Sequence, residues 1–146
     1  AEGATIITHK LNEEFFKTAL SLPRTLEPSG LSFVPVAVLG IGDSFTLSDP
    51  QNQIQLHRIQ DSAHADDMLI VYLPAIHAVV EADLLQPWID PLFGGGRTGP
   101  HPFLVHLASE LERLQLDYTQ FIPVHRPPQP PFMSKNDLMT AIGKGE

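Results

Sequence analysis

Histidine and carboxylate side chains offer this chain its widest choice of chemistry. The sequence holds 7 histidines and 17 aspartates and glutamates, and it contains no cysteine. Thiolate zinc sites, disulfides and cysteine nucleophiles are therefore excluded. Imidazole and carboxylate groups remain as metal ligands, and in a site without thiols these two ligand types suit zinc.

Three of these side chains stand next to apolar runs. His64 precedes the run 68–73, Asp83 closely follows the run 78–80, and His125 follows the run 121–124. A hydrogen-bonded histidine at a strand entrance is the plainer interpretation of His64, and the prolines near His125 fit a rigid turn. A carboxylate directly after an apolar strand is harder to explain as structure.

The other histidines carry weaker signals, and we expect structural or surface roles for them. His101 and His106 are not at the four-residue spacing that brings two imidazoles to one metal on a helix. His57 belongs to an alternating strand and is expected at the surface or opposite a neighbouring strand. The remaining members of this set are His9 and His77.

The runs 68–73 and 78–80 predict the central hairpin of a sheet, joined by a tight connection at 74–77. Their continuous apolar character is typical of strands that are covered on both faces. The alternation over 54–59 predicts a strand with one face in water. Nearer the N-terminus, residues 5–8 predict a strand, and 11–20 predict a helix that Asn12 is available to cap.

In the second half, apolar residues at helical spacing over 103–114 predict a helix with Glu110 and Glu112 facing outward. Ser134 and Asp137 have the spacing of a capping box that opens a last helix ending near Gly143. The order of strands and helices indicates a layered α/β domain.

The segment 86–102 contains several prolines and Gly94, Gly95 and Gly96, and it lacks an apolar period. It lacks the Lys-Ser/Thr ending and the strand-to-helix setting of a phosphate cradle. We interpret it as a flexible flap, with Trp88 and Phe93 as candidate substrate contacts.

Composition narrows the functional classes. The chain has 146 residues, which fits one domain, and 42% of them are apolar, which is enough for a core. A net charge of -8 with only 9 lysines and arginines argues against nucleic-acid or anionic membrane partners. No apolar run reaches the length of a membrane span, and the first residues lack the pattern of a secretory signal, so the compartment is left open.

The segments 61–74 and 78–84, with His64 before the strand, Tyr72-Leu73-Pro74 at its end and Asp83 after the next strand, resemble the middle of the metallo-β-lactamase superfamily. The stretch 111–125, ending in His125, and the tail 137–144 resemble the end of a branch of uncharacterised hydrolase-like members. The opening at 4–9 is similar to the strand that begins the second half of that fold. The likeness thus covers nearly the whole chain and only the latter half of the family.

The resemblance implies a fold and a site. The expected fold is half of an αββα sandwich, a mixed β-sheet flanked by helices, with residues 1–146 forming one domain that lacks the N-terminal metal-binding half. His64 would be the third histidine of the first zinc site, Asp83 the carboxylate bridging two zinc ions, and His125 the last ligand of the second site. The His-x-His-x-Asp-His motif of the family does not occur in this sequence.

Three positions differ from the family pattern. Asp67 stands where a small residue is usual, Ala82 stands where a glycine often precedes the bridging aspartate, and Arg126 stands where a glycine often follows the last histidine. Asp67 and Arg126 would place charges near the mouth of the site, so the substrate of a relative does not transfer to this chain.

The chemistry implied is hydrolysis by a two-metal centre, in which the ions activate a bridging water and polarise the substrate. Asp83 would have a second, catalytic role in orienting the attacking hydroxide. Three ligands divided between two sites bind metal weakly, so the chain alone is expected to be inactive until the N-terminal half is supplied. Substrates of the class are small esters, lactones or lactams. The alternative is a non-catalytic half-domain that forms a homodimer or pairs with a partner chain through its uncovered face.

Overall fold

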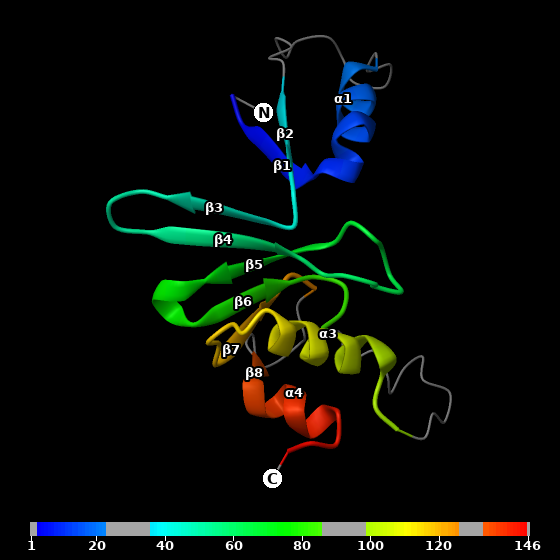
Figure 1. Cartoon of the computed structure of the whole chain (residues 1–146), viewed down its shortest axis with the longest axis vertical. Coiled ribbons are helices and arrows are strands. Elements are labelled where there is room, and N and C mark those ends of the chain that lie inside the picture. The colour runs from blue at the N-terminus through cyan, green and yellow to red at the C-terminus, as the bar shows by residue number, and fades with distance from the viewer. Residues whose placement is uncertain (1–2, 23–35, 86–98, 126–132, 146) are drawn as a thin grey trace.

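The computed structural model describes residues 3–22, 36–85, 99–125 and 133–145, and within them the chain is a mixed α/β protein (Figure 1). Most of the predicted flap, including Trp88 and Phe93, lies outside these residues, as do Arg126 and the rest of the proline-rich turn. No helix in the described ranges is both long enough and apolar enough to cross a membrane.

The main element is a six-stranded sheet in which the strands follow one another in chain order. Neighbouring strands are antiparallel except β6 and β7, which run parallel. The connection from β6 to β7 contains helix α3, as parallel neighbours require. The strands are β3 (Ser44–Ser48), β4 (Gln53–Arg58), β5 (Leu69–Leu73), β6 (Ala78–Glu81), β7 (Gln120–Pro123) and β8 (Met133–Ser134).

The predicted central hairpin is present as β5 and β6, joined by the 3-10 turn η2 (Pro74–Ile76). Burial along β5 alternates, because Ile70 and Tyr72 are buried whereas the residues between and beside them are only half-buried. One face of β5 is therefore fully buried and the other only half-buried, so the expected cover on both faces is only partly present. Its apolar residues on the second face pack less completely than those under the helices.

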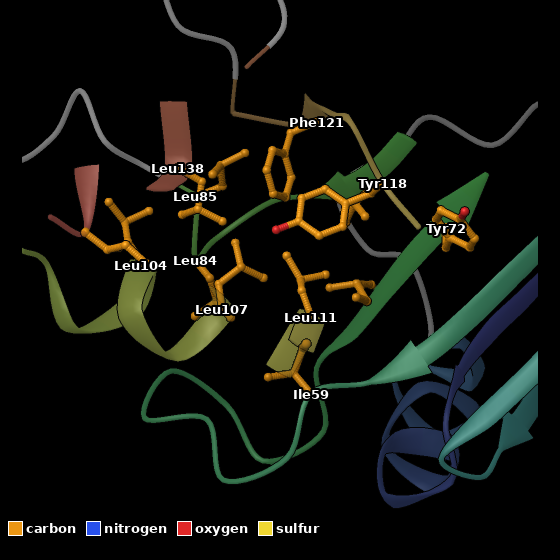
Figure 2. Close-up of a cluster of buried hydrophobic side chains, with 13 residues drawn as sticks. Ile59, Tyr72, Leu84, Leu85, Leu104, Leu107, Leu111, Tyr118, Phe121 and Leu138 are labelled. Carbon is orange, nitrogen blue, oxygen red and sulfur yellow. The ribbon is translucent and has the colours of Figure 1, made fainter. Parts of the chain in front are cut away.

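The core lies between this sheet and two helices, α3 (Pro102–Arg113) and α4 (Lys135–Ala141). Figure 2 shows leucines of α3 meeting Phe121 of β7 and Leu138 of α4, all almost fully buried. Each such side chain contributes roughly 1.5–3 kcal/mol by leaving water. The predicted α3 is confirmed, with Pro102 in its first turn and His101 accepting a hydrogen bond from the amide of Phe103.

A second, smaller unit contains β1 (Thr5–His9), η1 (Lys10–Asn12), α1 (Glu13–Ser21) and β2 (Ala37–Ile41). Strands β1 and β2 pair in parallel as a two-stranded sheet, at the end of the molecule away from α4 (Figure 1). Helix α1 has no buried residue, and Phe15 is 66% exposed. Asn12 does occupy the cap position, but its side chain makes no capping hydrogen bond.

The α/β class expected from the sequence is confirmed by the mixed sheet and its helices. Within the described residues, α3 and α4 form one helical layer on the six-stranded sheet. Glu110 was expected to face outward, and this was wrong. Its side chain is buried at 6% exposure, since it turns toward the connection between β4 and β5 instead of toward water.

Candidate metal centre

The register of β6 and β7 brings two of the predicted site residues to one edge of the sheet. Glu81 is paired with Pro123 in the parallel ladder, and Asp83 and His125 each lie two positions beyond this pair, just past the ends of β6 and β7. Equal offsets from a parallel pair leave the two side chains beside each other. The connection that carries His64 reaches the same edge, because β5 runs antiparallel to β6 and begins where β6 ends.

The three side chains meet through the carboxylate of Asp83. Its Oδ1 lies 2.7 Å from Nε2 of His125, and its Oδ2 lies 3.5 Å from Nε2 of His64. The side chains of His64, Asp83 and His125 are 43%, 35% and 56% exposed. The group therefore forms a polar rim that solvent and small molecules can reach.

Helix α3 holds the connection that carries His64. Glu110 accepts a hydrogen bond of 2.8 Å from the amide of Gln60, and His106 Nε2 lies 2.8 Å from the carbonyl oxygen of Gln60. The amide of His64 donates to the Ser62 hydroxyl at 3.2 Å. The imidazole of His64 also lies edge-on to the ring of Phe103, with the ring centres 5.8 Å apart.

The charges of Glu110 and Arg113 strengthen the contact between α3 and Gln60. The Arg113 guanidinium hydrogen-bonds to Glu110 and lowers the pKa of that carboxyl, against the opposing effect of burial, and the Gln60 amide lowers it further. Glu110 in turn raises the pKa of Arg113. The pair is consequently ionised at neutral pH, and it keeps Gln60 in place at the base of the His64 connection.

Two carboxylates beside the site, Glu81 and Glu110, had no role assigned from the sequence. Both are buried. Strand alternation gives a signal for Glu81, which lies two positions after the buried Val79 and so on the same face. Helical spacing gives one for Glu110, which lies three positions after Leu107 and so at the flank of the apolar stripe.

The contacts at the rim set the hydrogen positions that the group requires. An ionised carboxylate can only accept hydrogen bonds, so an imidazole that bonds to Asp83 must donate from Nε2. If the His125 ring is neutral and its Nε2 carries the hydrogen, its Nδ1 is unprotonated and carries the free lone pair. Binding a cation through Nε2 would require the other tautomer, with the hydrogen on Nδ1, and the hydrogen bond to Asp83 would then be replaced by bonds from both atoms to the cation.

The donor types fit zinc, which binds imidazole and carboxylate. Tetrahedral bonds of about 2.0–2.1 Å place two donor atoms roughly 3.3 Å apart, and the 3.5 Å between His64 and Asp83 is close to that spacing. His125 is nearer, at hydrogen-bond distance. Among the described residues, no three His, Cys, Asp or Glu side chains are arranged around a single metal position. The residues fit the metal in kind, and further donors are needed to complete a centre.

The remaining histidines make contacts that suit the structural roles expected for them. His77 lies 3.1 Å from the Asp117 carboxylate at the opposite edge of the sheet, and His57 contacts Gln55 on its own strand. His9 is buried at 1% exposure, and burial lowers the pKa of its imidazole. His101 caps α3, and His106 contacts the carbonyl oxygen of Gln60.

Comparisons with protein-family models and with curated proteins found no match to this chain. The relationship to the metallo-β-lactamase superfamily accordingly stays a prediction from the sequence motifs.

Proposed function

We propose that this chain carries the latter half of the metal centre of a zinc-dependent hydrolase of the metallo-β-lactamase superfamily. The observation that supports the proposal is the contact of both predicted histidine ligands with the predicted aspartate, at 2.7 and 3.5 Å. These residues follow three different strands of the sheet, so they do not lie together merely because they are neighbours in the sequence.

Each residue has a stated part in the proposed centre. Zinc, when bound, would supply an activated water and would polarise the oxygen of the substrate bond that is cleaved. His64 and His125 would hold the metal through neutral nitrogens, and Asp83 would hold it through its carboxylate. Asp83 is also the group of the three that can accept and orient a water proton at the rim.

The proposal includes a second set of ligands outside the described residues. Catalytic zinc takes about three protein ligands and one open position, whereas His64 and the pair Asp83 and His125 are divided between two positions. A segment carrying the family's histidine motif, on the same polypeptide or another, would complete the centre. The substrates proposed are small molecules with an ester, lactone or lactam bond.

Zinc titration with matched variants tests the role of Asp83. The chain is expected to bind zinc weakly, and Asp83→Asn is expected to lower that affinity at least tenfold. Losing a group that only orients a metal ligand costs about 10- to 100-fold, and Asp83 would itself be a ligand. Asp117→Asn is the control, since it removes the carboxylate from an aspartate–histidine contact that lies away from the rim. Equal affinity in the Asp83→Asn variant and the wild type would refute the proposal.

A second candidate function, a non-catalytic half-domain that pairs with another chain, is favoured by one specific observation. Helix α1 and its neighbours expose large apolar side chains, with Leu11 at 60%, Phe15 at 66% and Leu22 at 59%. Exposed apolar clusters of this kind are typical of association surfaces. Light scattering on a size-exclusion column separates the outcomes: a dimer or complex supports this candidate, and a sharp monomer of 16.1 kDa contradicts it.

A further inference from the structure

The proposed centre leaves a buried carboxylate immediately beside it without a role. Glu81 is the last residue of β6, and it is 3% exposed. Burying a carboxylate is costly unless hydrogen bonds replace its water. The contacts of Glu81 therefore indicate what the residue does.

The side chain of Glu81 binds the backbone of the turn that contains Asp83. Its Oε1 accepts from the amides of Asp83 and Leu84 at 3.0 Å each, and its Oε2 accepts from the amides of Leu84 at 3.0 Å and Leu85 at 2.7 Å. Three successive amides thus converge on one carboxylate. Leu84 and Leu85 are directed into the core, as Figure 2 shows, and the Asp83 side chain reaches the rim.

The backbone of the same residue holds the other side of the centre. The carbonyl oxygen of Glu81 accepts a hydrogen bond of 2.9 Å from the amide of Val124, the residue before His125. Its Cα is also paired with that of Pro123 in the parallel ladder. Glu81 is accordingly bonded to the backbone next to both members of the Asp83 and His125 contact.

We infer that Glu81 is a positioning residue that fixes Asp83 against His125, through its carboxylate on one side and its carbonyl on the other. This inference rests on the proposed function for its consequence in metal binding. A glutamine at this position would keep one accepting oxygen and would replace the other by an NH2 group, which faces backbone amides that are also donors. The turn would then shift, and the Asp83 carboxylate with it.

Glu81→Gln tests the inference by zinc affinity and by the absorption spectrum of the cobalt-substituted protein. The variant is expected to bind zinc roughly 10- to 100-fold more weakly, the range seen when groups that orient metal ligands are removed. The cobalt d–d bands are expected to change in position or intensity, which a loss of stability alone would not cause. Wild-type affinity with an unchanged cobalt spectrum would overturn the inference.

Two control variants separate positioning from general damage. Glu112→Gln removes an exposed carboxylate on α3 and should leave zinc affinity unchanged. Ser134→Ala weakens the cap of α4, away from the rim, and should lower stability without changing zinc affinity. If Ser134→Ala weakens zinc binding as much as Glu81→Gln does, the effect is one of stability and the inference fails.

A readout without metal keeps the inference separate from the proposed function. The 15N resonances of the imidazole of His125, measured at one fixed pH without zinc, are expected to move in Glu81→Gln, whereas those of His77 stay in place. Unchanged His125 resonances in Glu81→Gln would overturn the inference, whether or not the wild type binds zinc. Absence of zinc binding by the wild type, taken alone, would contradict only the proposed function. Should Glu81→Gln fail to fold, Glu81→Asp keeps the charge, shortens the reach by one methylene, and must still move the His125 resonances.

Discussion

The histidines of this chain differ in the groups that they contact, and these contacts indicate the role of each side chain. His106 contacts a backbone carbonyl, and His77 contacts the exposed carboxylate of Asp117. His64 and His125 share the carboxylate of Asp83 at an edge where strands end and loops begin. Among the residues that the structure describes, only this last arrangement combines two imidazoles with one carboxylate, which is why the proposed chemistry is assigned there.

Glu110 gives a prediction at the scale of one residue. Arg113 and the Gln60 amide lower the pKa of Glu110, so its stabilising effect is present above the ordinary glutamate pKa and is lost as pH falls through the lowered pKa of the folded state. Glu110→Gln is expected to cost about 1–3 kcal/mol at pH 7, since it weakens hydrogen bonds to a buried charged group. The variant should approach the wild type in stability as the pH is lowered below about 4.

Urea unfolding of the two proteins at a series of pH values between 7 and 3 measures this difference. A gap between the wild type and Glu110→Gln that stays constant over the whole series would show that ionisation of Glu110 is not what stabilises the contact. Glu112→Gln, which changes an exposed glutamate on the same helix, is the matched control and should follow the wild type throughout.

At the scale of elements, helix α4 depends on its first turn. It has only 7 residues, and a helix of this length has little stability of its own. Ser134 accepts from the amide of Asp137, and the Asp137 carboxylate accepts from the amide of Ser134, which is a complete capping box. The Ser134 amide and the Ser134 hydroxyl both donate to the Asp137 carboxylate, and these two bonds lower its pKa.

Ser134→Ala is therefore expected to destabilise the protein by about 0.5–2 kcal/mol, the usual cost of losing a cap. Thermal unfolding followed by circular dichroism gives the change, with Ser134→Thr, which keeps the hydroxyl, as the comparison. Because Leu138 of α4 is fully buried in the core, the loss should appear in the main unfolding transition. A separate early transition would instead show that α4 unfolds on its own.

Elements with a local signal were the ones that the sequence could predict. The capping box needs only Ser134 and Asp137, and α3 needs only its own apolar spacing. The positions of Asp83 and His125 after strands could also be predicted, since each of these residues follows an apolar run. The burial of Glu81 and Glu110 was not predicted, although each is spaced as a core residue. The groups that replace water around them are backbone amides and, for Glu110, the Arg113 guanidinium, and only the fold brings these groups together.

At the scale of the whole molecule, the arrangement of the two units was beyond sequence reasoning. The parallel pairing of β1 with β2 depends on partners that no local pattern specifies. The exposure of Phe15 is similar in kind, because the helical spacing of α1 predicts an apolar face but not whether anything packs on it. Burial of such a face is a property of the assembled molecule, and the mass measured by light scattering shows whether an assembly that could bury it forms.

The parallel pairing of β6 with β7 has a consequence for how the protein folds. Asp83 and His125 are 42 positions apart, and they meet only when that pairing has formed across the intervening helix. Contacts between such distant positions carry a high loop-closure cost and tend to limit the folding rate. The unfolded chain thus offers zinc scattered histidines in place of an assembled set of donors.

If the proposed function is right, zinc should change the unfolding rate and leave the folding rate unchanged. Stopped-flow refolding is expected to keep its rate when zinc is added, whereas unfolding slows, by an amount that corresponds to about 2.7 kcal/mol when zinc is at 100 times its dissociation constant. Faster refolding with zinc would mean that the ion organises the chain before the strands pair. In the expected case the ion binds only after the sheet has formed. It then lengthens the lifetime of the native state without speeding its formation.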